Sequence, residues 1–101
     1  MTTVTARAEN GRFMLLCEGH AEGDDPAICT AISTLCCTLE LWCANAGVKY
    51  ECEKKPGHFR ISFGQGHRSR TAFDLVLWGL LALQHDHETY LRVFTGKPDE
   101  R

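Results

Sequence analysis

The sequence has no excess of basic residues, no long apolar run and no paired cysteine motif, and each absence excludes a class of protein. Its 101 residues include 11 Lys and Arg against 13 Asp and Glu, for a net charge of −2. Generic nucleic-acid binders neutralise many phosphates and are usually strongly basic, so no direct contact with nucleic acid is required. A chain of this length is expected to form one domain, over residues 1–101, with a single core.

The longest apolar stretches are short and contain polar residues. Asp74 interrupts the stretch from Phe73 to Leu83, and hydroxyl residues interrupt the one from Ile28 to Leu35. Neither reaches the roughly 18 consecutive apolar residues of a membrane-spanning helix. The first seven residues also lack the basic start and apolar segment of a secretory signal. We therefore expect a cytoplasmic protein without a membrane partner.

The six cysteines include no C-x-x-C pair, which gives little support to a zinc site. Cys29, Cys36 and Cys43 recur every seven residues within a helical pattern, so neighbours in this series lie about 10 Å apart, too far to bridge. We expect reduced thiols, no metal and no cofactor. Cys36, Cys37 and Cys43 are expected to pack as small apolar residues.

Two kinds of periodicity alternate along the chain and predict its fold. Strands are expected at 3–9, 13–17, 48–53, 59–63 and 90–94, and helices at 26–45 and 71–84. The order ββαββαβ predicts the α+β class, as a two-layer sandwich. Its sheet is mostly antiparallel, and both helices lie on one face of the sheet.

The first expected helix has clear signals at both ends. Asp25 is a predicted N-cap, Pro26 suits the first helical position, and the segment 45–47 ends in a glycine that favours a stop. Its predicted buried stripe consists of Ile28, Ile32, Leu35, Leu39 and Trp42. Trp42 and Trp78, one in each expected helix, are predicted to pack in the core or between subunits.

Two reactive residue types flank the loop before this helix. Cys29 lies near the helix start, where the macrodipole and free N–H groups favour a thiolate. His20, at the end of the preceding strand, is placed to exchange a proton with Cys29, and such a pair supports acyl transfer. In the alternative interpretation both residues are structural. The acidic residues Glu22, Asp24 and Asp25 are candidates to orient His20, and equally candidates to cap or solubilise.

The segments Gly19-His20-Ala21 and Cys29-Thr30-Ala31-Ile32-Ser33, joined by an acidic loop, resemble the motifs of the ribosomal-processing cysteine protease family, Prp. The family pattern is G-H-A, a loop, and then D-x-x-C-A-A-x-S. Here the loop is short, and Pro26 stands where the pattern has its aspartate, one residue after Asp25. The resemblance also extends to the chain length and the order of elements.

The resemblance implies a cytoplasmic, homodimeric cysteine endopeptidase that removes the N-terminal extension of a large-subunit ribosomal protein. Cys29 falls on the nucleophile, His20 on the general base, and Ser33 on the motif's serine. Aromatic substrate residues before the scissile bond require an apolar trough beside Cys29, and backbone N–H groups near the helix start are expected to stabilise the oxyanion. The alternative is a non-catalytic, dimeric, ribosome-associated binding domain of the same fold.

Overall fold

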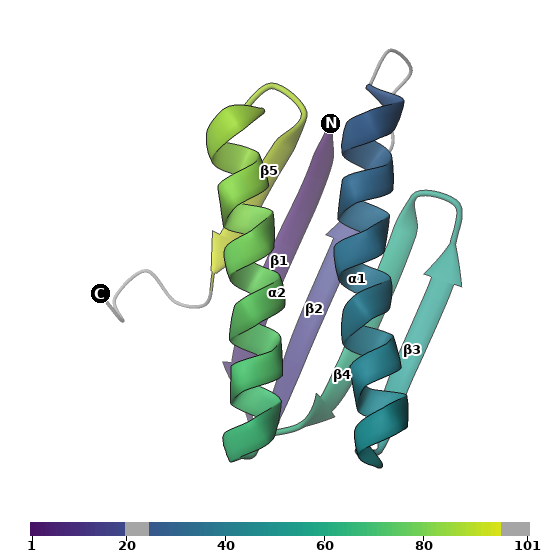
Figure 1. The fold of residues 1–101 in the computed structure, drawn as a ribbon, viewed down its shortest axis with the longest axis vertical. Coiled ribbons are helices and arrows are strands. Elements are labelled where there is room, and N and C mark those ends of the chain that lie inside the picture. The colour runs from purple at the N-terminus through teal and green to yellow at the C-terminus, as the bar shows by residue number, and fades with distance from the viewer. Residues whose placement is uncertain (20–24, 96–101) are drawn as a thin grey trace.

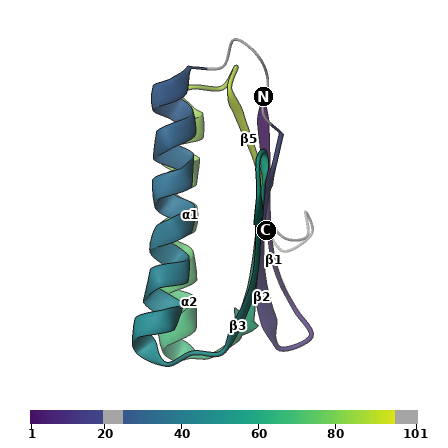
Figure 2. The same cartoon turned by 90° about the vertical axis from the view of Figure 1, so that its right-hand side faces the viewer.

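The computed structural model of the chain has a five-stranded sheet and two helices (Figure 1). It describes residues 1–19 and 25–95. The elements are β1 (Thr2–Glu9), β2 (Arg12–Glu18), α1 (Pro26–Ala46), β3 (Tyr50–Lys55), β4 (His58–Gly64), α2 (His67–Asp86) and β5 (Leu91–Thr95). This order confirms the predicted ββαββαβ arrangement and the α+β class. Both helices lie on one face of the sheet (Figure 2).

The strands follow the order β3-β4-β2-β1-β5 across the sheet. The β1–β2, β2–β4 and β3–β4 pairs are antiparallel, and β1–β5 is parallel. The predicted, mostly antiparallel sheet is therefore confirmed. Asn10 and Gly11, with φ of 55° and 75°, form the two-residue turn between β1 and β2. Positive φ at both turn residues matches the twist of an antiparallel hairpin.

The core fills the layer between the sheet and the helices. Alternate strand residues point into it, because successive side chains of a strand point to opposite faces. Phe13 of β2 stacks on Phe73 of α2, with ring centroids 4.7 Å apart. The largest fully buried side chains are Phe13, Phe63, Leu15, Leu39, Ile61, Leu80, Leu91 and Val4.

The buried face of α1 is rotated from the predicted stripe. Ile28, Ile32 and Leu39 are buried as expected, but Leu35 and Trp42 are only partly buried. Their places in the core are taken by Cys36 and Cys43, which lie one residue further along. Those two thiols confirm the packing role predicted for them, whereas Cys37 is exposed, so the prediction for that residue was wrong.

The second helix differs from its prediction in its start and its exposed face. It begins at His67, four residues before the predicted Thr71. The prediction started late because the first turn is polar and Gly66 provides no side-chain cap. Hydrophobic periodicity does not detect such a turn. Trp78 is 62% exposed, which excludes the core of this chain, and packing between subunits, the other predicted place for it, stays a prediction.

Average hydropathy singles out one helix that the search for uninterrupted apolar runs does not. By length and composition, the 21-residue helix α1 could cross a membrane, with a mean hydropathy of 1.6 over its most apolar window. Core helices of soluble proteins satisfy the same criterion. Here one face of α1, which includes Ile28, Ile32 and Leu39, is buried.

Candidate active site

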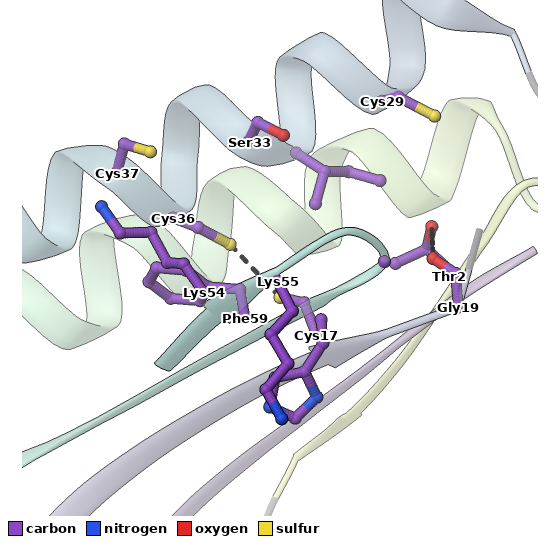
Figure 3. Close-up of a pocket in the computed structure, with 13 residues that line it drawn as sticks. Thr2, Cys17, Gly19, Cys29, Ser33, Cys36, Cys37, Lys54, Lys55 and Phe59 are labelled. Carbon is purple, nitrogen blue, oxygen red and sulfur yellow. Dashed lines mark hydrogen bonds between the residues drawn. The ribbon is translucent and has the colours of Figure 1, made fainter. Parts of the chain in front are cut away.

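A cavity of about 210 Å³ lies between the first half of α1 and the ends of β2, β3 and β4 (Figure 3). Helix α1 forms one wall of the cavity, and the β3–β4 turn with its flanking residues forms the other. The lining residues are Thr2, Cys17, Gly19, Cys29, Ile32, Ser33, Cys36, Cys37, Lys54, Lys55, Gly57, His58 and Phe59. Residues from four segments of the chain thus meet around one hollow.

Cys29 lies on the cavity wall in the first turn of α1 and is partly exposed. The turn is held by Asp25, whose side-chain oxygen accepts a hydrogen bond from the Ala27 N–H at 2.9 Å. The structure thus places Asp25 at the N-cap and Pro26 in the first turn. This geometry places the Cys29 thiol at the positive end of the helix, next to open space.

The N–H groups of this first turn already have acceptors. Ala27 donates to the Asp25 side chain, and Ile28 and Cys29 donate to the Asp25 carbonyl at 3.0 and 3.2 Å. Pro26 has no N–H to offer. These three donors are therefore used within the first turn, and the oxyanion hole expected from backbone N–H groups near the helix start stays a prediction.

His20, the predicted general base, lies outside the described residues, as do Glu22 and Asp24. Its neighbour Gly19 lines the cavity, and the Gly19 N–H donates to the Gly57 carbonyl at 3.0 Å. Gly19 has a φ of 105°, and a Cβ there would collide with the Met1 carbonyl oxygen. Only glycine fits at this point, which anchors the residue before His20 beside the cavity.

Ser33 and Cys37 follow Cys29 at four-residue intervals along α1, and all three line the cavity. Residues four apart lie on the same face of a helix. No described residue forms a hydrogen bond with the Ser33 hydroxyl, which is exposed toward the cavity (Figure 3). The hydroxyl is therefore available to a molecule bound beside Cys29.

The deeper part of the cavity is apolar. Ile32 and Phe59 contribute hydrocarbon surface, and the thiols of Cys17 and Cys36 meet there at 3.2 Å. The hydrogen bond with the Cys17 thiol and burial raise the pKa of Cys36 far above its ordinary value, so Cys36 remains neutral. The structure therefore contains an apolar trough next to Cys29, the feature that the family resemblance requires.

The end of the cavity away from Cys29 is polar. The Lys54 Nζ donates to Glu40 Oε1 at 2.7 Å, and this contact lowers the pKa of Glu40 and raises the pKa of Lys54. His58 lies between two carboxylates, with Nδ1 3.4 Å from Glu18 and Nε2 3.3 Å from Glu53. Sequence reasoning missed Lys54, Lys55 and His58, because only strand pairing brings them opposite α1.

No family model and no curated protein matches the sequence. Among solved structures, the chain is similar to the essential ribosomal processing protease Prp from S. aureus in complex with a covalently linked product peptide. The TM-score is 0.81 at 15% identity, covering 94% of this chain and 99% of that one. The same protease in complex with a substrate peptide gives a TM-score of 0.80 at 14% identity, with the same coverage.

A protein from Streptococcus mutans gives a TM-score of 0.72 at 17% identity, and 96% of each chain is covered. At these identities the likeness concerns the fold. The similar region spans nearly the whole of each chain, so no large element is added or lost. The chain therefore has the fold of the ribosomal processing protease Prp, as the resemblance implied.

Proposed function

We propose that the chain is a cysteine endopeptidase that removes the N-terminal extension of a large-subunit ribosomal protein in the cytoplasm. The carrying observation is the position of Cys29, which lies in the first turn of a capped helix and borders an apolar cavity. The Prp fold and the Gly19-His20-Ala21 motif support the assignment. No cofactor is needed, because the thiol and the imidazole carry out every step.

In the proposed reaction, the Cys29 thiolate attacks the scissile carbonyl carbon and forms a C–S bond. His20, as the imidazolium, gives its proton to the leaving amine as the C–N bond breaks. Water then attacks the acyl-enzyme while His20 accepts its proton, which releases the acid and restores the thiolate. Since the first-turn N–H groups are occupied, we assign the Ser33 hydroxyl as a donor to the developing oxyanion.

The cavity favours an extended peptide with an apolar side chain next to the scissile bond. Ile32 and Phe59 can bury such a side chain within reach of α1. At roughly 25 cal/mol per Å² of apolar surface, burying one aromatic side chain would stabilise the complex by a few kcal/mol. Such a cavity suits a substrate with aromatic residues just before the cleaved bond.

The test is cleavage of a purified ribosomal protein precursor that carries its extension, followed by mass spectrometry. The wild-type chain should release the extension, and Cys29→Ala should abolish release. Cys37→Ala is the matched control, because Cys37 is an exposed thiol on the same cavity and helix face. Cleavage that survives Cys29→Ala unchanged would overturn the proposal.

The alternative function is a non-catalytic, dimeric, ribosome-associated binding domain. The reactivity of Cys29 toward iodoacetamide near pH 6 distinguishes the two. An enzyme should label at Cys29 well before Cys37, and His20→Ala should slow the labelling of Cys29 alone. Equal, slow labelling of both thiols would favour the binding domain.

A further inference from the structure

Two thiols from different elements meet beneath the cavity. Cys17 is on β2 and Cys36 is on α1, and their sulfur atoms are 3.2 Å apart (Figure 3). The side chains are 5% and 2% exposed, so the pair lies at the junction of the sheet and helix layers. Nineteen residues separate the two positions in sequence.

We propose that Cys17 and Cys36 form an oxidation site, at which a peroxide converts the two thiols into a disulfide. The sulfur atoms of a disulfide are about 2.0 Å apart, so those of Cys17 and Cys36 need to approach by little more than 1 Å. Cys29 and Cys43 lie about two turns from Cys36 on the same helix, too far to compete. Adjacent Cys37 could pair with Cys36 only with strain.

The cavity gives a small oxidant access to this pair. Cys17 and Cys36 both line it, although little of either side chain is exposed. A cavity of about 210 Å³ holds several water-sized molecules, since each water occupies roughly 30 Å³ in the liquid. Cys43 is equally buried but does not line the cavity, so it should remain reduced.

Hydrogen peroxide serves as the two-electron oxidant of the two thiols. One thiolate attacks the peroxide and forms a sulfenic acid, and water leaves once the departing hydroxide takes up the thiol proton. The second sulfur then attacks the sulfenic sulfur, which forms the S–S bond and releases a second water. Two thiols and one peroxide thus yield one disulfide and two waters. Because the contact with Cys17 and burial keep Cys36 protonated, we expect the reaction to take minutes to hours.

The disulfide would covalently join α1 to β2 under the wall that carries Cys29. It follows from the fold and the thiol geometry, and it does not rest on the proposed function. A crosslink across about 19 residues restricts the unfolded chain, so we expect the oxidised form to melt roughly 10 °C higher than the reduced form.

The experiment treats the reduced full-length chain with millimolar hydrogen peroxide, quenches it, and alkylates the remaining thiols under denaturing conditions. Cleavage after glutamate separates residues 10–18, which contain Cys17, from residues 23–40, which contain Cys36. Residues 23–40 also contain Cys29 and Cys37, so tandem mass spectrometry of the joined peptides identifies which of the three cysteines is linked. We expect these peptides to be joined through Cys17 and Cys36, and separated by a reductant.

Two variants sharpen the result. Cys37→Ala should retain the crosslink, and Cys36→Ala should lose it, although both remove one thiol from α1. Should Cys36→Ala fold poorly, the peptide map of the wild-type chain decides alone. Recovery of Cys17 as its alkylated thiol, or a link from Cys17 to Cys29 or Cys37, would overturn the inference.

Discussion

Gly79 of α2 lies directly against Leu35 of α1, so that a Cβ at position 79 would be 2.9 Å from Leu35 Cδ2 and 3.3 Å from its Cδ1. The missing side chain lets the two helices approach closely while both remain packed on the sheet. Leu35 is only partly buried, so the end of its side chain has some room to move. The size of residue 79 should therefore control the stability of the helix layer.

Gly79→Val should lower the free energy of unfolding by about 2 kcal/mol, since overpacking typically costs 1–3 kcal/mol. Gly79→Ala should be close to neutral, because displacement of Leu35 is offset by the roughly 1 kcal/mol that alanine gains over glycine within a helix. Urea unfolding of both variants measures the difference. A valine variant as stable as the alanine variant would show that the helices separate freely.

Asp25→Ala should lower the free energy of unfolding by about 1 kcal/mol, because it removes the acceptor of the Ala27 N–H at the start of α1. Asp25→Asn keeps a side-chain oxygen and is the matched control. Thermal melts followed by circular dichroism compare the three proteins. Equal melting of the alanine and asparagine variants would contradict a capping role.

The six thiols should react with iodoacetamide in a defined order. Burial raises the pKa of Cys43 and of Cys52 to about 11, so at pH 8 only about 0.1% of each is thiolate. Cys37 and Cys29 should be labelled first, because both reach the surface and Cys43 does not. Peptide mapping over time gives the rates, with Cys37→Ser to separate the two fast sites. Labelling of Cys43 as fast as Cys37 would contradict this order.

The Glu40–Lys54 pair should contribute a pH-dependent increment of stability. The contact lowers the pKa of Glu40 in the folded protein. The ion pair therefore contributes its full stability at pH values above the ordinary glutamate pKa, and this stability is lost as the pH falls through the pKa of Glu40 in the folded protein. The pKa of Lys54 is raised, so the ion pair keeps its full stability at every pH below the ordinary lysine pKa. Lys54→Met should therefore melt below wild type from about pH 6 to 9, and equally with it near pH 3.

Lys55→Met is the control for this pair, because Lys55 has no ion-pair partner within the described part of the chain. Its melting temperature should follow that of the wild type at every pH. Since Lys54 is half exposed, the increment is small and should weaken with added salt. A Lys54→Met deficit that persists at pH 3 would point to lost packing instead.

We propose that the chain forms a homodimer, and the exposed apolar residues of α2 offer a test. Leu75 and Trp78 are 59% and 62% exposed on the surface of α2. Trp78→Lys should shift a dimer toward monomer in sedimentation experiments if this face is the interface, with Arg70→Lys as a control on the same helix. An unchanged dimer would place the interface elsewhere.

Local signals predicted most of the fold. Asp25 and Pro26 begin α1 and Gly47 ends it with a φ of 73°, because caps depend on neighbours in sequence. Which helix side chains are buried was less predictable. Cys36 and Cys43 displaced Leu35 and Trp42 from the core, since the rotation of a helix is set by the sheet beneath it.

Sequence also located Cys29 and Ser33 on one helix face, since their spacing is helical. It could not place the opposite wall of the cavity. Lys54, Lys55 and His58 reach this wall through the pairing of β3 with β4 and of β4 with β2. The β3–β4 pairing is a local hairpin, but the β4–β2 pairing joins residues far apart in the chain, such as His58 and Glu18, and alternation within one strand does not specify its partners.

The parallel pairing of Thr2 with Leu91 has a consequence for synthesis of the chain on the ribosome. Translation makes β1 long before its partner β5, and the pair joins residues 89 positions apart. Until β5 emerges, β1 is an edge strand with unpaired backbone groups, and such edges favour aggregation. The nascent chain is therefore open to aggregation along this edge until β5 has been made, and pairing with β5 then covers the edge of β1.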